Sequence, residues 1–287
     1  MNETRVARST TKPEMSTFRS VLVPIDFGRI GDRALATVAA LAARAPLDIH
    51  LATVSAVGLD VTRDQMDLVS RARRLGVTEV HTHIIETGAD IPADLEPAAD
   101  VASGLHVLLE ALPTPLLCIA SHGRTAIGEM LLGSVTDDLL RTYTGPTLVV
   151  GPDADPGRVP PTLAVCVGPD GTSQQLTSAA SAWQRTFGGC IELVEVIEPT
   201  ATRLEPPSTL VDAAHHLRGQ MITVASHDPA QALIDVAFDR DVMLAVAAHL
   251  RRGVARVVLG SVAWEVIQRS PTAVLVVPMP RSGGSIE

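Results

Sequence analysis

The first half of the chain alternates short, almost continuously apolar runs with longer segments in which alanine and leucine recur every three or four positions. Short apolar runs are typical of buried strands, and the longer periodicity is typical of amphipathic helices. The pattern predicts five strands, at 20–25, 49–54, 80–85, 116–120 and 147–150. It predicts four intervening helices, at 30–44, 61–75, 97–112 and 134–141. Such alternation indicates a parallel sheet with helices on both faces, where ligands bind beyond the carboxyl ends of the strands.

The second half of the chain repeats the motifs of the first. Residues 116–122, 132–135 and 148–150 are similar to residues 243–249, 259–262 and 275–277, always at a spacing of 127. The first strands, at Val21 and Leu163, instead have a spacing of 142, so the second copy is shorter between its first and fourth strands by the difference of the two spacings. We expect its second helical region to be the shorter one. The sequence therefore predicts an α/β protein with two tandem, doubly wound, parallel five-stranded sheets.

A segment rich in proline and glycine, residues 151–161, separates the two copies. We place the boundary near Asp155, with a first domain at 18–154 and a second, degenerate domain at 155–280. Residues 1–17 are predicted to be a disordered lead-in, and residues 281–287 a tail. The last strands of the two copies are expected to pair through their edges, which gives an intramolecular pseudo-dimer; a homodimer is the alternative.

Composition excludes several partners and chemistries. A net charge of −9 with 2% aromatic residues does not suit nucleic acid, and the single lysine, Lys12, leaves the folded region without the lysine of a P-loop, a kinase site or a Schiff base. The three cysteines, Cys118, Cys166 and Cys190, are far apart and are predicted to be buried thiols rather than zinc ligands. No uncharged apolar run reaches the length of a membrane-spanning helix and no signal peptide is evident, which predicts a cytoplasmic protein without membrane contact.

One loop of the first copy has residues that suit a nucleotide polyphosphate. Ala120 and Gly123 leave room for a ligand beside the main chain, and nine residues later Gly133 and Ser134 precede a helix. The amide groups of that first helical turn, with the Ser134 hydroxyl, form an anion site. An ordinary strand–loop–helix connection with a serine cap is the alternative. Asp26, which follows the first strand, should reach the same edge of the sheet, where it is either a ribose acceptor or a turn residue.

Other candidate sites are weaker. His81 and His83 share one strand face without an acidic or cysteine companion, and His215 and His216 are adjacent on a helix, so no metal site is predicted. His122 has no nucleophile paired with it, and no G-x-S-x-G elbow is present. No catalytic residue is therefore named.

The motifs at 21–26, 121–125, 131–135 and 146–150 resemble those of the universal stress protein family. The resemblance covers most of residues 18–150 and, more loosely, 163–277. It implies a Rossmann-like fold of the adenine nucleotide alpha hydrolase type, and it implies binding of ATP, alone or with Mg²⁺, through a G-x2-G-x9-G-[ST] motif. The residues implied to bind the nucleotide are Pro24, Ile25, Asp26, Val54, Ile119, Ala120, Gly123, Arg124, Gly133, Ser134, Val135 and Thr136.

Both copies depart from the family motif. Its first glycine is Ala120 here, whose methyl group would crowd a ligand and would be strained at a positive φ. The second copy has Leu250 in place of the loop glycine, and its acidic residue, Asp170, comes two places late. Nucleotide binding is therefore expected mainly in the first copy.

Three functions follow from this sequence. The first is a stress-response protein that binds ATP in its first domain and acts as a nucleotide-responsive regulatory or interaction module, with protein partners that the sequence does not identify. The second is a scaffold or dimerisation module of the same fold without nucleotide. The third, slow ATP hydrolysis, needs a positioned water and a cation that the sequence does not specify.

Overall fold

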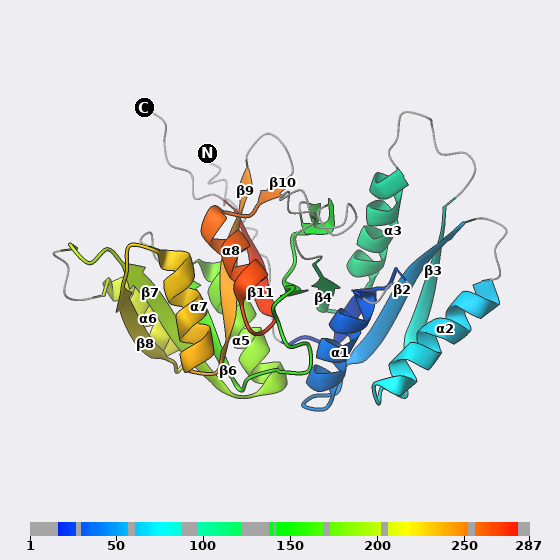
Figure 1. Cartoon of the computed structure of the whole chain (residues 1–287), viewed down its shortest axis with the longest axis horizontal. Helices are drawn as coiled ribbons and strands as arrows, with labels where there is room; N and C mark the ends of the chain where they lie inside the picture. The colour runs from blue at the N-terminus through cyan, green and yellow to red at the C-terminus, as the bar shows by residue number, and fades with distance from the viewer. Residues whose placement is uncertain are drawn as a thin grey trace, which may run out of the picture.

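A computed structural model describes residues 17–26, 30–56, 61–87, 97–121, 138–140, 142–168, 173–201, 206–251 and 256–280. These residues form one continuous sheet of 11 strands, with helices packed on both faces (Figure 1). None of the described helices is long and apolar enough to cross a lipid bilayer.

The first half contains the predicted elements in the predicted order. Its strands and helices are β1 (Ser20–Pro24), α1 (Gly31–Ala42), β2 (Asp48–Ala56), α2 (Val61–Arg74), β3 (His81–Thr87), α3 (Pro97–Ala111), β4 (Pro115–Ala120) and β5 (Thr147–Val150). The predicted fourth helix is described only at residues 138–140, which are helical.

The second half repeats this order and adds one short strand. Its elements are β6 (Thr162–Val167), α5 (Gln174–Phe187), β7 (Cys190–Ile197), α6 (Ser208–His216), β8 (Gln220–Ala225), α7 (Pro229–Asp239), β9 (Val242–Arg251), β10 (Arg256–Val258), α8 (Ser261–Arg269) and β11 (Val274–Pro280). The strand order across the sheet is β3-β2-β1-β4-β5-β11-β9-β6-β7-β8, with β10 paired to β9. In each half the winding reverses next to the first strand, between β1 and β4 and between β6 and β9. A crevice is expected at the carboxyl ends of those strands.

The predicted shortening of the second copy lies mainly elsewhere than expected. The interval from the start of β2 to the start of β3 is only slightly longer than the interval from β7 to β8. By contrast, the interval from the start of β3 to the start of β4 is much longer than the interval from β8 to β9. The expectation of a shorter second helical region is therefore mostly wrong, because most of the missing chain lies around the third helix.

The two halves are joined through their last strands, as the sequence predicts. β5 and β11 run antiparallel, with Leu148 opposite Leu275 and Val149 opposite Val274. Both strands are buried, and each also pairs with a parallel neighbour in its own half. The pairing therefore leaves neither strand as an exposed edge of the sheet.

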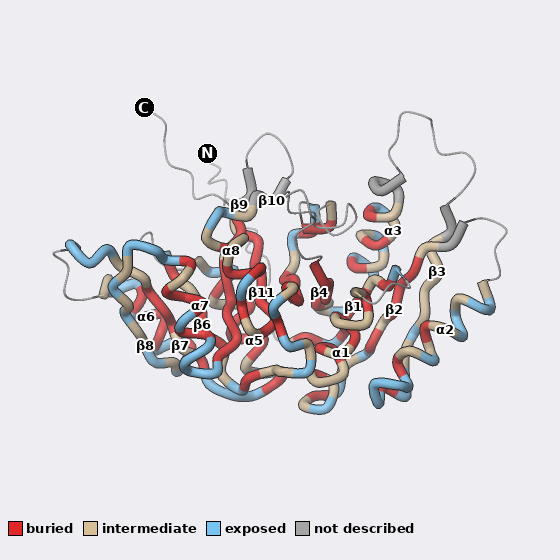
Figure 2. Tube along the Cα trace, in the orientation of Figure 1, coloured by how far each residue is buried: buried red, intermediate tan, exposed pale blue. Residues whose placement is uncertain are grey.

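Two apolar layers enclose this sheet, and both extend through the two halves. One layer contains buried side chains of α1, α2, α5 and α6, and the other contains those of α3, α7 and α8. Figure 2 shows the buried positions concentrated on the strands and the exposed ones on the outer helix surfaces. Cys118 is buried in the first layer, but Cys190, the first residue of β7, is exposed, so the expectation of three buried thiols is wrong there.

The linker between the halves is held by polar side chains of α1. Arg33 Nη2 donates to the carbonyl oxygens of Gly151 at 2.7 Å, Pro152 at 3.1 Å and Ala154 at 2.7 Å. One helical turn later, Thr37 Oγ1 donates to the carbonyl oxygen of Pro156 at 2.8 Å. The linker is thus fixed along α1, because its carbonyl groups find donors on the helix surface.

Aromatic side chains form a second contact between the halves. Phe18, which precedes β1, packs edge-on against Trp183 and stacks on Phe187, both on α5. The Phe18 amide also donates to Thr186 Oγ1 at 2.8 Å. The chain has only seven aromatic residues, so this cluster uses three of them to attach the start of the first sheet to the second half.

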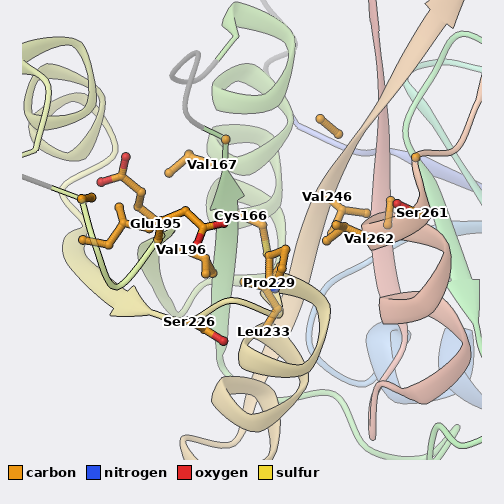
Figure 3. Close-up of a pocket in the computed structure, with 17 residues that line it drawn as sticks. Cys166, Val167, Glu195, Val196, Ser226, Pro229, Leu233, Val246, Ser261 and Val262 are labelled. Atoms are coloured by element: carbon orange, nitrogen blue, oxygen red, sulfur yellow. The ribbon is translucent and has the colours of Figure 1, made fainter.

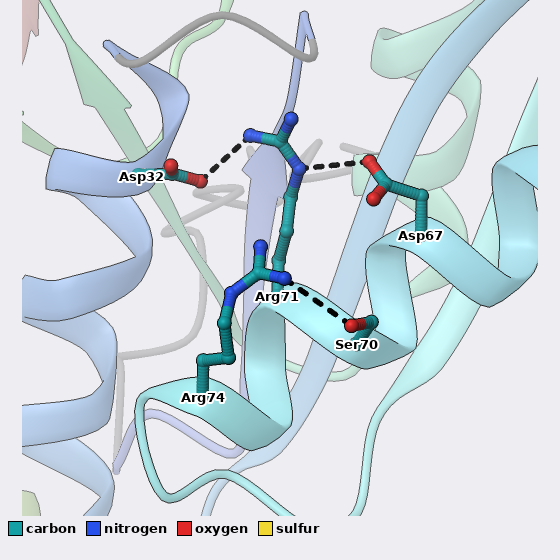
Figure 4. A network of polar contacts seen from close by, with 5 residues as sticks. All are labelled: Asp32, Asp67, Ser70, Arg71 and Arg74. Carbon is teal, nitrogen blue, oxygen red and sulfur yellow. Dashed lines mark hydrogen bonds and ion pairs between the residues drawn. The ribbon is translucent and has the colours of Figure 1, made fainter.

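Arg71 joins the first two helices. Its guanidinium lies 2.8 Å from Asp67 on α2 and 2.8 Å from Asp32 in the first turn of α1, and Arg74 donates to Ser70 on the next turn (Figure 4). Arg71 is largely buried, and its stem packs between the helices. The ion pairs therefore join the first turn of α1 to the last turns of α2.

Three histidines, His50, His81 and His83, lie on β2 and β3, the two strands at the outer end of the first sheet. Figure 1 shows where these two strands lie. The rings of His50 and His81 stack with centroids 4.7 Å apart, and those of His50 and His83 with centroids 5.2 Å apart. Burial lowers the pKa of His50 to about 4, and the neighbouring His81 and His83 contribute in the same direction. Burial, with His81 beside it, also lowers the pKa of His83. The folded protein therefore favours the neutral forms of His50 and His83.

We expect Gly151→Ala to destabilise the protein by about 1–3 kcal/mol, because a methyl group there would overlap the carbonyl oxygen of Ile267 on α8. Gly157→Ala, on the same linker, is the matched control, since its nearest neighbour is an Asp155 carboxylate oxygen at 3.6 Å. Urea unfolding of both variants measures the difference. Equal stability of the two variants would show that the linker does not hold α8 this closely.

We expect the free energy of unfolding to decrease as the pH is lowered from about 6.5 to 4, because of His50 and its neighbours. The folded-state pKa of His50 is lowered to about 4, so its stabilising contribution is present above the unfolded pKa and is lost as the pH falls toward 4. His50→Gln should remove about 1 kcal/mol of this pH dependence, allowing for solvent screening of a half-exposed ring. The free energy of unfolding at pH 7.5 and 4.5 gives the measurement. His215→Gln, at an exposed position on α6, should leave the pH dependence unchanged.

Candidate functional site

The first strand and the fourth strand bring predicted site residues to one edge of the sheet. β1 and β4 are parallel neighbours, with Val21 opposite Leu116. Pro24, Ile25 and Asp26 follow along β1, and Ala120 ends β4 opposite Val150. The expectation that Asp26 and the end of β4 share an edge is confirmed. Both positions lie where the winding of the sheet reverses, which is the usual ligand position in this class of fold.

Asp26 is exposed at this edge and lies beside the start of α1. A Cβ atom placed on Gly31 would lie 3.4 Å from Asp26 Oδ1 and 3.4 Å from the Ile25 main chain. Gly31 thus keeps the first turn of α1 close to the end of β1. On the neighbouring strand, Val54 lies two residues beyond Ala52, which is opposite Pro24. Asp26 and Val54 therefore flank the same end of β1.

Half of the predicted residues lie outside the described part of the chain. These are Gly123, Arg124, Gly133, Ser134, Val135 and Thr136. Asp170 in the second copy also lies outside it, as do the predicted lead-in up to residue 16 and the tail.

The second half contains a pocket of about 700 Å³ at the corresponding edge of its sheet (Figure 3). The volume falls within the range of about 300–1,000 Å³ that is usual for small-molecule sites. The ends of β6, β7 and β9 form its floor, and the amino-terminal turns of α7 and α8 form its wall. It therefore lies at the second reversal of winding, between β6 and β9.

The pocket is lined by counterparts of the residues predicted in the first half. Strands β1 and β2 correspond to β6 and β7 at a spacing of 142, since Val23 lies opposite Leu51 and Val165 lies opposite Leu193. The later elements correspond at a spacing of 127. The lining counterparts of Pro24, Ile25, Asp26, Val54, Ile119, Ala120, Gly133, Ser134, Val135 and Thr136 are Cys166, Val167, Gly168, Val196, Val246, Ala247, Gly260, Ser261, Val262 and Ala263.

An alanine at the first glycine position does not close this pocket. Ala247 lies in the regular strand β9, opposite Val277, and forms part of the pocket wall. Its counterpart Ala120 lies in β4 with ordinary strand pairing, and its φ angle is not positive. The expectation of strain at Ala120 is therefore wrong, because the strand continues through this position in both halves.

Two glycines leave open space inside the pocket. A Cβ atom on Gly168 or on Gly260 would meet no atom of the described residues within 4 Å, apart from its neighbours in the chain. Gly260 has φ −65° and ψ 160°, which any residue adopts, and it precedes the first turn of α8. Among the described residues, neither packing nor backbone conformation requires a glycine at position 260. The free space next to the first amides of α8 therefore suits a ligand.

The chemistry of the lining favours binding over covalent catalysis. Most of the surface is aliphatic, and burial raises the pKa of the Cys166 thiol to about 12, so this sulfur is not a nucleophile near neutral pH. Glu195 borders the pocket, but it alternates along β7 with Val194 and Val196, which pack with α7 and α8. Strand alternation therefore directs its side chain toward the α5 and α6 face. Glu198, at the rim, lies 2.8 Å from His227.

The second half differs from its expected loop structure at Leu250. The sequence places Leu250 in a phosphate loop, but β9 continues to Arg251, with Leu250 opposite Val257 of β10. The main chain of this segment is thus paired between two antiparallel strands and is not left free for phosphate. The second site therefore differs from the predicted first site in two ways: Leu250 is paired in a strand, and Gly168 stands at the position of Asp26.

Several wall residues are not evident from the sequence. Ser226, Pro229 and Leu233 line the pocket from the β8–α7 connection, where the second copy is shortened. No residue spacing carries over from the first half at this place. In the sequence, Asp228 followed by Pro229 is typical of a helix start, and this pair is the one sign of these wall residues. In the structure the Asp228 carboxylate accepts a hydrogen bond from the Gln231 amide at 3.0 Å and so begins α7.

Metal binding by three or more side chains is not evident in the part of the chain that the structure describes. No group of three histidine, cysteine, aspartate or glutamate side chains there surrounds a position for a metal ion.

The sequence matches a known protein family twice. The model of the universal stress protein family matches residues 17–151 and again residues 162–278. Among curated proteins, UDP-N-acetylglucosamine 1-carboxyvinyltransferase 3 of Symbiobacterium thermophilum is 31% identical over 112 residues, which cover 38% of this chain. The match spans only 26% of the length of that relative, so its activity is not transferred.

Solved structures show the same fold. A universal stress protein from Archaeoglobus fulgidus DSM 4304 aligns over 90% of this chain and 98% of its own, with a TM-score of 0.59 and 16% identity. A functionally unknown protein from Pseudomonas aeruginosa PAO1 aligns over 92% of this chain and 94% of its own, with a TM-score of 0.59 and 14% identity. These similarities establish the two-copy architecture and leave the ligand to be inferred from the site.

Proposed function

Because this chain belongs to the universal stress protein family and contains two tandem copies of its domain, we propose that it is a stress-response protein that binds ATP in its first domain. In this proposal it acts as a nucleotide-responsive regulatory or interaction module. The first domain is taken as residues 18–154 and the second as residues 155–280.

One observation carries this proposal: the second copy has a pocket at the place that the repeat assigns to the nucleotide in the first. Ten of the residues that line it are counterparts of residues proposed to bind ATP. The first copy has the same strand order at this place and, in addition, has Asp26 where the second has Gly168. In this proposal Asp26 supplies the acceptor that a ribose requires, which supports ATP in the first copy.

Each group has a definite proposed role. The Asp26 carboxylate accepts hydrogen bonds from the ribose hydroxyls, and Val54 and Ile119 contact the adenine. Ala120 and Gly123 allow the ligand to approach the main chain. The phosphates are bound at the start of the fourth helix, by Gly133, Ser134, Val135 and Thr136, with Arg124 nearby and Mg²⁺ as their counter-ion where one is bound.

The second copy is proposed to differ in ligand. Its pocket has Gly168 in place of the ribose acceptor, and Glu198 at its rim is paired with His227. The extension of β9 through Leu250 replaces the phosphate loop by paired strand. ATP is therefore assigned to the first copy alone.

We expect Asp26→Ala to weaken ATP binding at least about 10-fold, because the ribose hydroxyls lose a charged acceptor worth about 1.5–3 kcal/mol. Circular dichroism and urea unfolding of the Asp26→Ala variant separate loss of binding from loss of structure. Asp212→Ala, on exposed α6 in the second half, is the matched control and should bind ATP as the unmodified protein does. Calorimetric titration of the full-length protein measures all three. Absence of binding at millimolar ATP by the unmodified protein would reject the proposal.

We expect Ala120→Gly to change ATP affinity by less than about threefold, because the counterpart Ala247 borders an open pocket. A scaffold whose site has been closed by the alanine methyl group would instead gain measurable ATP binding from this change. The same calorimetric titration distinguishes the two. A large gain in affinity would mean that the unmodified chain has lost its nucleotide function.

A further inference from the structure

The histidine cluster on β2 and β3 is separate from the nucleotide site and lies at the opposite ends of the strands. His50 lies opposite His81 in the parallel register, and His83 is the next residue on the same face of β3. Strand alternation in the sequence relates His81 to His83 but not to His50, because His50 lies on another strand and its register with them is a property of the fold. The cluster contains three of the nine histidines of the chain.

We propose that His50 and His83 form a two-nitrogen site for a divalent transition-metal ion that favours tetragonal coordination, Cu²⁺ first and Ni²⁺ second. His50 Nδ1 and His83 Nε2 lie 2.9 Å apart. Both rings are half-buried, and His81, which stacks on His50, is exposed. Water molecules complete the coordination on the solvent side.

The separation of the two nitrogens is compatible with a tetragonal ion. Two imidazole nitrogens bound about 2.0–2.1 Å from one ion lie about 2.9 Å apart when they subtend about 90°, as in tetragonal sites. A tetrahedral ion such as Zn²⁺ requires about 3.3–3.4 Å between the same atoms. In the free protein the 2.9 Å spacing is that of the hydrogen bond between the two rings, and an ion that takes its place would meet both nitrogens at about 90° without a large movement of the strands. The general order of affinities places Cu²⁺ first.

The protonation state of the cluster also suits a metal. Burial lowers the pKa of both His50 and His83, so both rings are neutral near pH 7 and carry a lone pair. In the free protein one ring donates its N–H to the other. On metal binding that proton moves to the second nitrogen of the same ring, so each ring stays neutral and no net proton is released. Asp48, exposed two residues before His50 on the same strand face, adds a favourable negative charge.

The position of the site gives it a structural consequence. β3 is the last strand at its end of the described sheet and pairs only with β2. An ion held by His50 and His83 joins these two strands through side chains in addition to their main-chain pairing. Metal binding should therefore raise the unfolding temperature of the protein.

Titration of the untagged, full-length, EDTA-stripped protein with Cu²⁺ tests the proposal. We expect one ion per chain, a paramagnetic resonance spectrum with hyperfine coupling to two imidazole nitrogens, and weaker binding of Zn²⁺. His50→Gln and His83→Gln should each raise the dissociation constant about 10-fold or more, since either change leaves one ligand. His81→Gln should change it less than about threefold, and His215→Gln on α6 should leave it unchanged.

Three results would overturn the proposal: unaltered binding in both His50→Gln and His83→Gln, a spectrum without two-nitrogen coupling, or tighter binding of Zn²⁺ than of Cu²⁺. The resonance spectrum uses the unmodified protein, so the assignment remains testable even if a variant does not fold. Circular dichroism of each variant in EDTA separates loss of a ligand from loss of structure. ATP binding does not enter any of these measurements.

Discussion

The antiparallel pairing of β5 with β11 is the constraint on which the rest of the structure depends. Each half alone would expose the backbone of its last strand, and the pairing satisfies both strands at once. It also makes one sheet of the two halves, so that the apolar layers continue across the junction. The strand pairing determines how the two halves are oriented. The hydrogen bonds of Arg33 to the linker and the packing of Phe18 on α5 add further contacts that stabilise the same orientation.

The same pairing determines where ligands can bind. Because β5 and β11 run in opposite directions, the carboxyl edges of the two parallel halves also point in opposite directions along the sheet. Neither half can supply strand ends to the site of the other. Each site is therefore built within one copy, from the strands that flank its reversal of winding, and the two sites are free to differ in chemistry, as Asp26 and Gly168 do.

The sequence predicts the strands, the double winding and the pairing of the last strands because these follow from local hydrophobic pattern and from the repeat. It does not predict which helix region is shortened, since Ser226, Pro229 and Leu233 have no counterpart at a fixed spacing. Leu250 is misplaced because pairing with Val257 is a contact between segments that local pattern does not reveal. His50 is missed for the same reason: its partners become neighbours only through the register of β2 and β3.

The repeat explains why the first copy is the better candidate for a nucleotide even though the pocket is seen in the second. A pocket of the right size requires only strand ends, small residues and a helix start, and the second copy supplies all three. Selectivity for a nucleoside triphosphate requires in addition an acceptor for the ribose and main-chain donors left free for phosphate. Asp26 supplies the first in one copy only, and in the other the main chain at Leu250, the counterpart of Gly123, is paired with β10, although the first amides of α8 still border the pocket. The second copy thus has a cavity at the place that the repeat predicts, and Gly168 in place of Asp26 is the difference at its rim that bears most directly on a ribose.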